Sequence, residues 1–418
     1  MKLQSWVEVP ENSDFTIYNI PFGIIQYGEL PPRAAVAIGN YAVDLSVLFE
    51  KGYFDNDLLD VNYFDSYILN PFIGLGKETT SKVRLHIQNL LSTNENRLKE
   101  DQDTREKAFI PLEEVNMQIP IFIPNYTDFY SSIEHATNVG TMFRDPDNAL
   151  LPNWKHIPVG YHGRSSSIVP SGVPLHRPKG QQVIGDSTTP VFGPSRLVDF
   201  ELEMAFITNT NTQLGNAIHV NDAEDYIFGM VLFNDWSARD IQKWEYVPLG
   251  PFLAKNFGSS ISPWVVTLDA LEPFRVESPK QDPEVLPYLQ YEGKRNFDIQ
   301  LQVAIQPENQ EETVVCKSNF KYMYWNMSQQ LAHHTVNGCN IEIGDVYASG
   351  TISGKTPDSY GSMLELSWRG TKPLKMKDGS ERKFINDFDT VIMRGHCEKD
   401  DIRIGFGEVK SQLLPAKD

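Results

Sequence analysis

The chain has 418 residues, of which 40% are hydrophobic and 22% are charged. That length exceeds the needs of one ordinary core and predicts two domains, and the composition predicts an ordered globular protein. The formal net charge of -18 argues against nucleic acid or an anionic membrane as a partner. The same charge is compatible with a metal site built from oxygen ligands.

The three cysteines, Cys316, Cys339 and Cys397, are widely spaced. This usage fits a reducing compartment and predicts neither a disulfide framework nor a zinc cluster. The first 20 residues lack a basic start followed by an apolar run, and no stretch approaches the roughly 18 apolar residues of a membrane span. We therefore expect a cytoplasmic protein that does not enter a membrane.

Residues 1–120 form the predicted N-terminal domain. Short extended stretches at 22–27 and 34–45 are broken by Gly and Pro, and a helical pattern follows at 81–98. A polar segment and two prolines, Pro111 and Pro120, then interrupt the pattern. We place the domain boundary there, so that residues 121–418 form the second domain.

The second domain is predicted to be mostly strands. Its extended stretches alternate with turns rich in Gly, Pro and Asn, and they cover residues 167–170, 198–207, 228–234, 262–268, 297–305 and 345–348. A helical pattern is clearest at 324–334. The expected fold class is therefore mainly β.

The most informative of these strands is the segment Val198–Phe206, in which apolar and acidic residues alternate. Successive side chains of a strand point to opposite faces, so Asp199, Glu201 and Glu203 are predicted to share one face. Three carboxylates in one row repel one another and need either water or a cation. The simplest interpretation is a half-buried strand with a solvated acidic face.

Two further aspartates, Asp128 and Asp235, come directly after apolar runs, where strands leave the core. With Glu201 and Glu203 they would form a set of hard oxygen ligands without cysteine or a close histidine pair. Such a set favours Ca²⁺ or Mg²⁺ over zinc. Aspartates at strand ends also serve as caps and turn formers, so the spacing leaves both interpretations open.

Five blocks of sequence, in order, resemble the fumarylacetoacetase family; they cover residues 128–136, 158–164, 199–203, 234–240 and 350–354. The resemblance runs through nearly the whole chain. It implies hydrolysis of 4-fumarylacetoacetate to fumarate and acetoacetate, the last step of tyrosine and phenylalanine breakdown, by a dimeric, cytosolic, metal-dependent enzyme. The implied fold is an N-terminal SH3-like barrel followed by a mixed β-sandwich roll.

Cleavage of a carbon–carbon bond by water requires a base for the water and donors for the oxyanion. A histidine oriented by a carboxylate is a natural base near neutral pH. The resemblance assigns this role to His135, oriented by Glu365. It assigns the oxyanion and leaving-group positions to Arg239, Gln242 and Lys255, where preorganised donors stabilise developing charge.

The departing fragment is a carbanion unless its charge spreads onto a ketone, and a divalent cation assists this as a Lewis acid. The resemblance assigns four carboxylates to this metal: Asp128, Glu201, Glu203 and Asp235. It assigns substrate contacts to Tyr130, Arg144, Gln242, Tyr246 and Thr351. It also implies a second, structural Mg²⁺ held by Asp235 with Lys255 and Ser259, although the family usually has Thr in place of Ser259.

Two alternatives remain open from the sequence. One is another reaction of the same superfamily, such as acylpyruvate hydrolysis or oxaloacetate decarboxylation, because related folds host different chemistry. The full-length N-terminal domain and the combination of His135, Gln242 and Tyr246 argue against it. The other is a non-catalytic β protein that binds Ca²⁺ to hold its fold. A purely structural site would not require His135 and Glu365 to contact each other.

Overall fold

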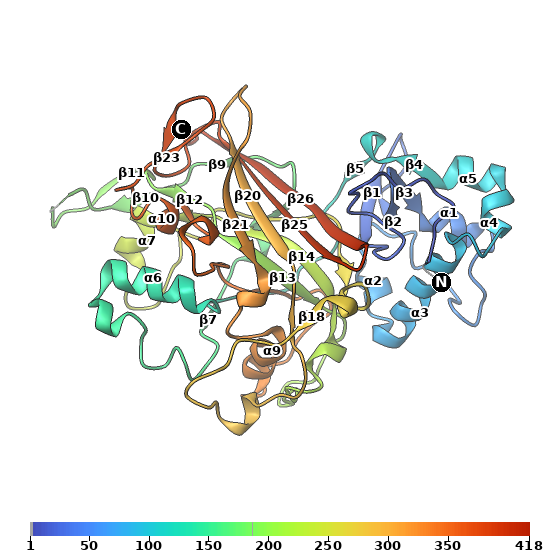
Figure 1. Ribbon diagram of the computed structural model, residues 1–418, viewed down its shortest axis with the longest axis horizontal. Helices are drawn as coiled ribbons and strands as arrows, with labels where there is room; N and C mark the ends of the chain where they lie inside the picture. The colour runs from blue at the N-terminus through green and yellow to red at the C-terminus, as the bar shows by residue number, and fades with distance from the viewer. Residues whose placement is uncertain (1–2, 186) are drawn as a thin grey trace.

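The computed structural model describes residues 3–185 and 187–418 and is mainly β, as the sequence predicts. The N-terminal part, blue in Figure 1, is built on a five-stranded antiparallel sheet in the order β4-β3-β2-β1-β5. Its strands are β1 (Phe22–Gln26), β2 (Arg33–Ile38), β3 (Tyr41–Asp44), β4 (Phe109–Pro111) and β5 (Asn116–Met117). Between β3 and β4 the chain forms the helices α1 (Leu45–Glu50), α2 (Asn70–Ile73), α3 (Gly76–Leu90), α4 (Arg97–Glu100) and α5 (Gln102–Ala108).

The second part of the chain contains two large sheets. The first has the order β7-β6-β22-β13-β14-β16-β8, and β17 pairs with β14 beside this path. Its strands are β6 (Tyr126–Phe129), β7 (Gly160–His162), β8 (Ile168–Pro170), β13 (Leu202–Thr208), β14 (Ile227–Asp235), β16 (Ser259–Ile261), β17 (Val266–Thr267) and β22 (Val346–Ala348).

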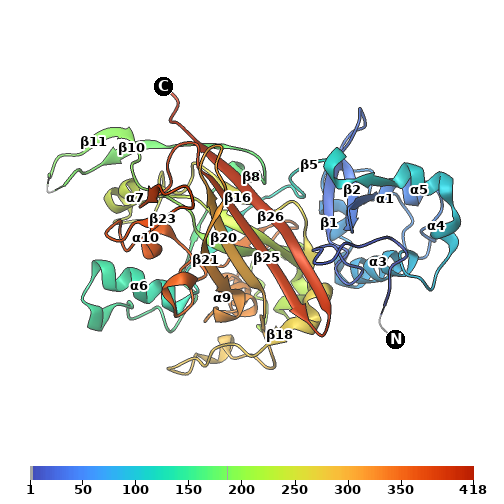
Figure 2. The ribbon, with the colours of Figure 1, turned by 45° about the horizontal axis from the view of Figure 1, so that its top comes forward.

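The second sheet has the order β21-β20-β25-β26-β9 and crosses over the first in both ribbon views (Figures 1 and 2). Its strands are β9 (Leu175–His176), β20 (Gln300–Gln306), β21 (Thr313–Asn319), β25 (Thr390–Lys399) and β26 (Ile402–Leu414). Apolar side chains from both sheets fill the space between them, including Leu202, Leu232, Leu301 and Phe406. This is the two-layer packing of a β-sandwich.

Shorter elements surround the two sheets. Four two-stranded ribbons are β10 (Lys179–Gln182) with β11 (Val191–Pro194), β12 (Val198–Asp199) with β15 (Ser237–Ala238), β18 (Arg275–Val276) with β19 (Asn296–Phe297), and β23 (Leu374–Lys375) with β24 (Glu381–Arg382). The helices are α6 (Ile133–Phe143), α7 (Arg239–Glu245), α8 (Leu268–Leu271), α9 (Met327–Thr335) and α10 (Met363–Leu366). Within the described residues, no helix combines the length and apolar character that crossing a membrane requires.

The N-terminal part is joined to the rest by both apolar packing and backbone hydrogen bonds. Phe22 of β1 exchanges two backbone hydrogen bonds with Val265, at 3.0 and 2.7 Å. The amide of Asn19 donates to the carbonyl of Gly405 at the start of the returning strand β26, at 2.7 Å. One apolar cluster includes residues of β1 together with Ala205 and Val231 of the first large sheet. The N-terminal part therefore covers one face of that sheet.

Because both faces of β13 are covered, the solvated acidic face that the alternation alone indicates does not form. Leu202, Met204 and Phe206 face the second sheet, while Ala205 and Ile207 face the N-terminal part. The alternation predicted the two faces correctly, but every residue from 198 to 206 is buried. The carboxylates of this segment must therefore be balanced by partners inside the protein.

Candidate active site

His135 and Glu365 form a buried hydrogen-bonded pair from elements 230 residues apart in the chain. Ser132 caps α6, and its hydroxyl accepts from the His135 backbone N–H, which sets His135 in the first turn. The Nδ1 atom of His135 lies 2.7 Å from Oε2 of Glu365. An ionised carboxylate can only accept, so Nδ1 carries the proton and the neutral ring keeps a lone pair on Nε2.

Glu365 is held by several donors besides the histidine. Asn138 donates to Oε1 at 2.9 Å, and Ser353 and Ser362 donate to Oε2 at 3.0 and 2.9 Å. Burial opposes ionisation of this carboxyl group, but His135 and the donated hydrogen bonds outweigh it, and the pKa of Glu365 is lowered. The base of the pair is therefore oriented by a carboxylate that is itself fixed.

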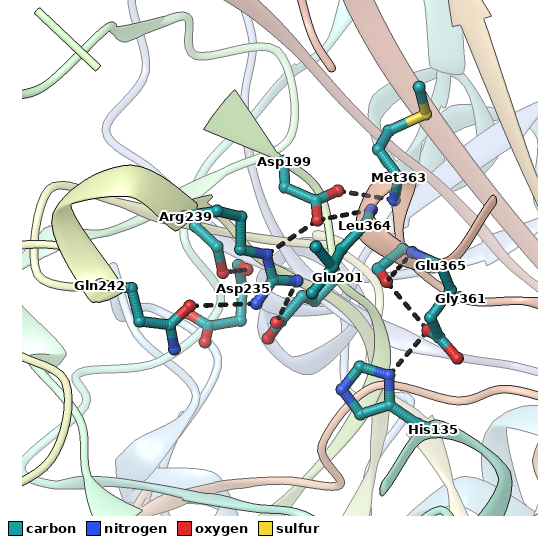
Figure 3. A network of polar contacts seen from close by, with 12 residues as sticks. His135, Asp199, Glu201, Asp235, Arg239, Gln242, Gly361, Met363, Leu364 and Glu365 are labelled. Atoms are coloured by element: carbon teal, nitrogen blue, oxygen red, sulfur yellow. Dashed lines mark hydrogen bonds and ion pairs between the residues drawn. The ribbon is translucent and has the colours of Figure 1, made fainter. Parts of the chain in front are cut away.

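Arg239 begins α7 and lies on the opposite side of the site from His135 (Figure 3). Its Nε donates to Asp199 at 2.8 Å, its Nη1 donates to Gln242 at 3.2 Å, and its Nη2 lies 2.6 Å from Glu201. Burial would lower its pKa, but Glu201 and Asp199 raise it above the usual range. The guanidinium is charged and held at all three nitrogens.

Lys255 connects Glu201 to Asp235. Its Nζ lies 2.5 Å from Oε2 of Glu201 and 2.5 Å from Oδ2 of Asp235. Burial favours its neutral form, but the two carboxylates raise its pKa. An ammonium has no acceptor, so the Lys255 side chain cannot ligate a metal; only its backbone carbonyl could. The Ser259 hydroxyl donates to Asp235 Oδ1 at 3.0 Å.

Asp128, Glu203 and Asp235 form a compact carboxylate cluster. Each is buried and offers an oxygen, and these oxygens lie within 4.8 Å of one another. Among the described residues, Oδ1 of Asp128 and Oε1 of Glu203 have no hydrogen-bond partner. Burial and the neighbouring carboxylates raise the pKa of both groups well above the usual range. Unpaired buried oxygens at this separation fit the ligand set of a hard divalent cation.

Glu201 is predicted to join this cluster, but in the structure its carboxylate is held by Arg239 and Lys255. Burial opposes its ionisation, yet the charges of Lys255 and Arg239 lower its pKa to about 2. It therefore lies between the arginine and the carboxylate cluster. Its assignment to the metal stays a prediction.

Tyr161 contacts the carboxylate cluster, although the sequence predicts no role for it within the block 158–164. Its hydroxyl lies 2.7 Å from Asp235 and 3.2 Å from Asp128, and a second tyrosine, Tyr126, donates to Asp128 at 2.6 Å. These hydroxyls hold the outer oxygens of the cluster. Tyr161 stands out in the sequence because it lies in the block 158–164. The sequence alone did not link either tyrosine to a carboxylate.

The predicted substrate residues are spread around the same site. Tyr130 packs edge-on against His135, with 5.2 Å between ring centroids, and Thr351 is buried next to Gly350, whose N–H donates to Glu203. Arg144 is exposed and donates to the carbonyl of Ala149, outside the hydrogen-bonded network. Tyr246 is 53% exposed at the end of α7. The structure thus brings Tyr130 and Thr351 to the site and leaves Arg144 and Tyr246 at its margin.

The sequence predicts only a solvated strand position for Asp199, and this prediction is wrong. Asp199 is completely buried, and besides Arg239 it accepts hydrogen bonds from the backbone of Met363 and Leu364. The alternating pattern predicted its face, but only the fold reveals what covers it.

A buried histidine–carboxylate pair facing an arginine, beside a carboxylate cluster, is an arrangement suited to hydrolysis. Comparison with known families agrees with it. Residues 18–120 match the fumarylacetoacetase N-terminal model, and residues 125–413 match the fumarylacetoacetate (FAA) hydrolase C-terminal model. The chain is a hydrolase and belongs to the fumarylacetoacetate hydrolase family.

The sequence is also similar to curated fumarylacetoacetases over its full length. It is 53% identical to the human protein over 416 residues, which cover 99% of both chains. It is 54% identical to the Dictyostelium discoideum protein over 420 residues, which cover 99% of this chain and 98% of that one. The Arabidopsis thaliana protein is 48% identical, with 99% of both chains covered.

Solved structures with much lower identity share the fold. A fumarylacetoacetate hydrolase from Exiguobacterium antarcticum superposes with a TM-score of 0.52 at 17% identity, covering 95% of this chain and 100% of that one. A maleylpyruvate hydrolase from Sphingobium superposes with a TM-score of 0.50 at 14% identity, covering 95% and 100%. At such identities the likeness concerns the fold alone.

Proposed function

We propose that this protein hydrolyses 4-fumarylacetoacetate to fumarate and acetoacetate, the last step of tyrosine and phenylalanine breakdown, in the cytoplasm. The observation that carries the proposal is the buried His135–Glu365 pair facing Arg239. The full-length identity to curated fumarylacetoacetases supports the substrate. A metal site with only a structural purpose would have no need of this pair.

In this mechanism His135 removes a proton from the attacking water. The Nε2 lone pair receives the proton, and Glu365 stabilises the imidazolium that results. Because Glu365 accepts four hydrogen bonds, the ring is held in one orientation before water arrives. Attack on the carbonyl carbon gives a tetrahedral oxyanion. Its collapse breaks the carbon–carbon bond and releases fumarate, and the acetoacetate carbanion takes up the proton that His135 removed from water.

Arg239, Gln242 and Lys255 are the residues we propose to stabilise negative charge. Arg239 and Lys255 are buried cations fixed by carboxylates, so they require little rearrangement as charge develops. We also assign substrate contacts to Gln242 and to four further residues: Tyr130, Arg144, Tyr246 and Thr351. Arg144 could form a fork to a substrate carboxylate once the substrate orders it.

The carboxylate cluster is the proposed metal site. Asp128, Glu203 and Asp235 would hold Ca²⁺ or Mg²⁺, with Glu201 as a fourth ligand, and the cation would act as a Lewis acid on the diketone oxygens. We keep the proposal of a second Mg²⁺ near Asp235, Lys255 and Ser259. The Lys255 side chain could take part there only by neutralising charge.

The test of the function is an assay of the purified chain with 4-fumarylacetoacetate and, separately, with acylpyruvates and oxaloacetate. We expect turnover of 4-fumarylacetoacetate to be fastest. The His135→Asn variant should lose about 10²–10⁴-fold in kcat because water is no longer deprotonated. His219→Asn, at an exposed histidine, is the matched control. Full activity of the His135 variant would exclude His135 as the general base. Faster turnover of an acylpyruvate would favour the alternative reaction.

Metal binding is tested separately from activity. The melting temperature of wild-type protein freed of metal should rise when Ca²⁺ or Mg²⁺ is added, because a cation that binds only the native state stabilises it. The stabilisation is about 2.7 kcal/mol when the cation concentration is 100 times Kd. Asp235→Asn should weaken this gain and lower the metal content. Asp387→Asn, at a half-exposed carboxylate paired with Arg177, is the control. An unchanged melting shift in the Asp235 variant would exclude it from the ligands.

We also propose that the chain acts as a homodimer, as the family resemblance implies. A cluster of exposed apolar side chains supports this; it lies on the end of α7 and the following loop and comprises Trp244, Tyr246, Val247, Leu249, Phe252 and Leu253. Burial of such a cluster against a second copy would remove it from water. The β10–β11 hairpin lies beside it, since Trp244 donates to Gln181.

A further inference from the structure

Asp199 joins the two halves of the site. Its Oδ2 accepts from Arg239 Nε at 2.8 Å and from the Leu364 N–H at 3.0 Å, and its Oδ1 accepts from the Met363 N–H at 2.6 Å. Met363 and Leu364 are the first two residues of α10, the helix that carries Glu365. One buried carboxylate thus holds both the arginine and the backbone from which the histidine's partner projects (Figure 3).

We propose that Asp199 is a positioning residue that fixes the distance and orientation between Arg239 and the His135–Glu365 pair. This inference rests on the proposed function of that pair. Asp199 touches neither His135 nor the carboxylate cluster through any hydrogen bond described in the structure. Its effect on turnover would therefore pass through Arg239 and Glu365.

The surrounding backbone makes this connection rigid. Asp199 pairs with Ser237 in the β12–β15 ribbon, two residues before Arg239. On the other side, the N–H of Leu202 donates to the carbonyl of Gly361 at 2.9 Å, and Glu201 and Ser362 form a β-bridge. The segment 199–202 therefore lies between the strand that leads to Arg239 and the segment that leads to Glu365. Asp199 is the side chain that reaches both.

Arg239 and His135 must act on the same substrate carbonyl from opposite sides, so their relative position decides the rate. A misplacement of about 1 Å can lower a rate by roughly 100-fold. In Asp199→Asn, an amide group of nearly the same shape replaces the carboxylate. Its NH₂ must face at least one of the three donors that Asp199 now accepts from, so either Arg239 or α10 loses its partner.

The matched control is Asp389→Asn. Asp389 is also buried, also pairs with an arginine, Arg382, at 2.7 and 2.8 Å, and also accepts from a backbone N–H, that of Asn386. None of these contacts belongs to the site. Loss of this pair should lower the melting temperature and leave kcat within about twofold of wild type.

The experiment measures kcat and KM for both variants, alone and combined with Arg239→Lys. We expect Asp199→Asn to lower kcat about 10- to 100-fold with KM changed less than about threefold. In the Arg239→Lys background the additional loss should shrink, because residues that act through one another are not additive. A kcat within twofold of wild type, or losses that add fully, would overturn the proposal.

Two measures keep the result interpretable. If Asp199→Asn does not fold, Asp199→Ser is held to the same criteria, since it also removes the charged acceptor. All values are ratios to wild type, measured on whichever ketonic acid the wild type cleaves fastest, so a wrong substrate proposal does not alter the test. A crystal structure of the variant should show Arg239 or α10 displaced; unchanged positions of both would also overturn the proposal.

Discussion

Glu201, directly before β13, and Glu203, within it, lie two residues apart, yet their carboxyl groups have opposite electrostatic surroundings. Two buried cations lower the pKa of Glu201 to about 2, while burial and the carboxylates of Asp128, Asp235 and Glu201 raise the pKa of Glu203. The same residue type is therefore held as an anion at one position, while at the other its ionised form is disfavoured. The local charge of the neighbours decides this, since burial opposes ionisation in both.

Asp345 provides a test of this reasoning away from the site. It is buried next to β22 and accepts hydrogen bonds from the N–H of Glu342 and the amide of Asn125, but burial outweighs these and raises its pKa from 3.8 to about 6. A carboxyl group with a raised pKa in the folded state favours folding below pH 4, and this contribution is lost as the pH rises through about 6. The difference between the two pKa values, 3.8 and about 6, corresponds to roughly 3 kcal/mol in the free energy of unfolding.

We therefore expect Asp345→Asn to be more stable relative to wild type at pH 7 than at pH 4, by up to about 3 kcal/mol. Urea unfolding of both proteins at the two pH values measures the difference, and the comparison cancels the titration of all other groups. Asp358→Asn, at an exposed position, serves as control. An equal stability difference at pH 4 and pH 7 would contradict the assignment.

At the scale of elements, local sequence predicted some features and missed others for physical reasons. The strand patterns predicted β1, β14, β20 and β22 to within about three residues, and the helical pattern at 324–334 corresponds to α9. The helical pattern at 81–98 instead begins earlier and ends at Leu90 in α3. The predicted strand at 262–268 is largely a connection, in which Val266–Thr267 pair with β14 and Val265 forms an isolated bridge with Phe22.

The longest strands, β25 and β26, were not predicted at all. Their burial pattern is irregular because they pair with each other across a bulge near Arg394, so neither shows a clean alternation. The helices α6 and α7, which carry His135 and Arg239, have 11 and 7 residues, lengths at which tertiary packing contributes more to helix stability than local propensity does.

The candidate site shows the same limit. The residue types and the acidic strand pointed to hard-metal chemistry, but the pairing of His135 with Glu365 spans 230 residues, and only the family resemblance suggested it. Asp199 and Tyr161 had no assigned role because their partners come from distant elements: α7 and α10 for Asp199, and β6 and β14 for Tyr161. Spacing within one segment cannot reveal such partners.

At the scale of the whole molecule, we propose residues 1–120 and 121–418 as two domains that share an interface along the first large sheet. The N-terminal part covers the face of β13 and β14 that includes Ala205 and Val231. The site lies at the end of those same strands, away from the N-terminal helices. The N-terminal part therefore packs against the strands that carry the site, and it supplies none of the predicted site residues.

The proposed homodimer is tested at this scale. Leu249→Glu combined with Phe252→Glu places two charges in the exposed apolar cluster, in which these side chains are 97% and 67% exposed. We expect wild-type protein to have twice the 47.5 kDa mass of one chain by light scattering and the variant to approach one chain's mass. Leu214→Glu, at another exposed leucine, is the control. A monomeric wild type, or a dimeric variant, would contradict the proposal.

The hydrogen bond between Asn19 and Gly405 is a contact that can form only late in synthesis of the chain. It joins positions separated by 386 residues, and the Asp14 carbonyl accepts another bond from the same glycine's N–H. While the chain is being synthesised, the first domain emerges long before Gly405 does. Its sheet can form early, but the hydrogen bonds that join Asp14 and Asn19 to Gly405 can form only after the chain has been synthesised past residue 405.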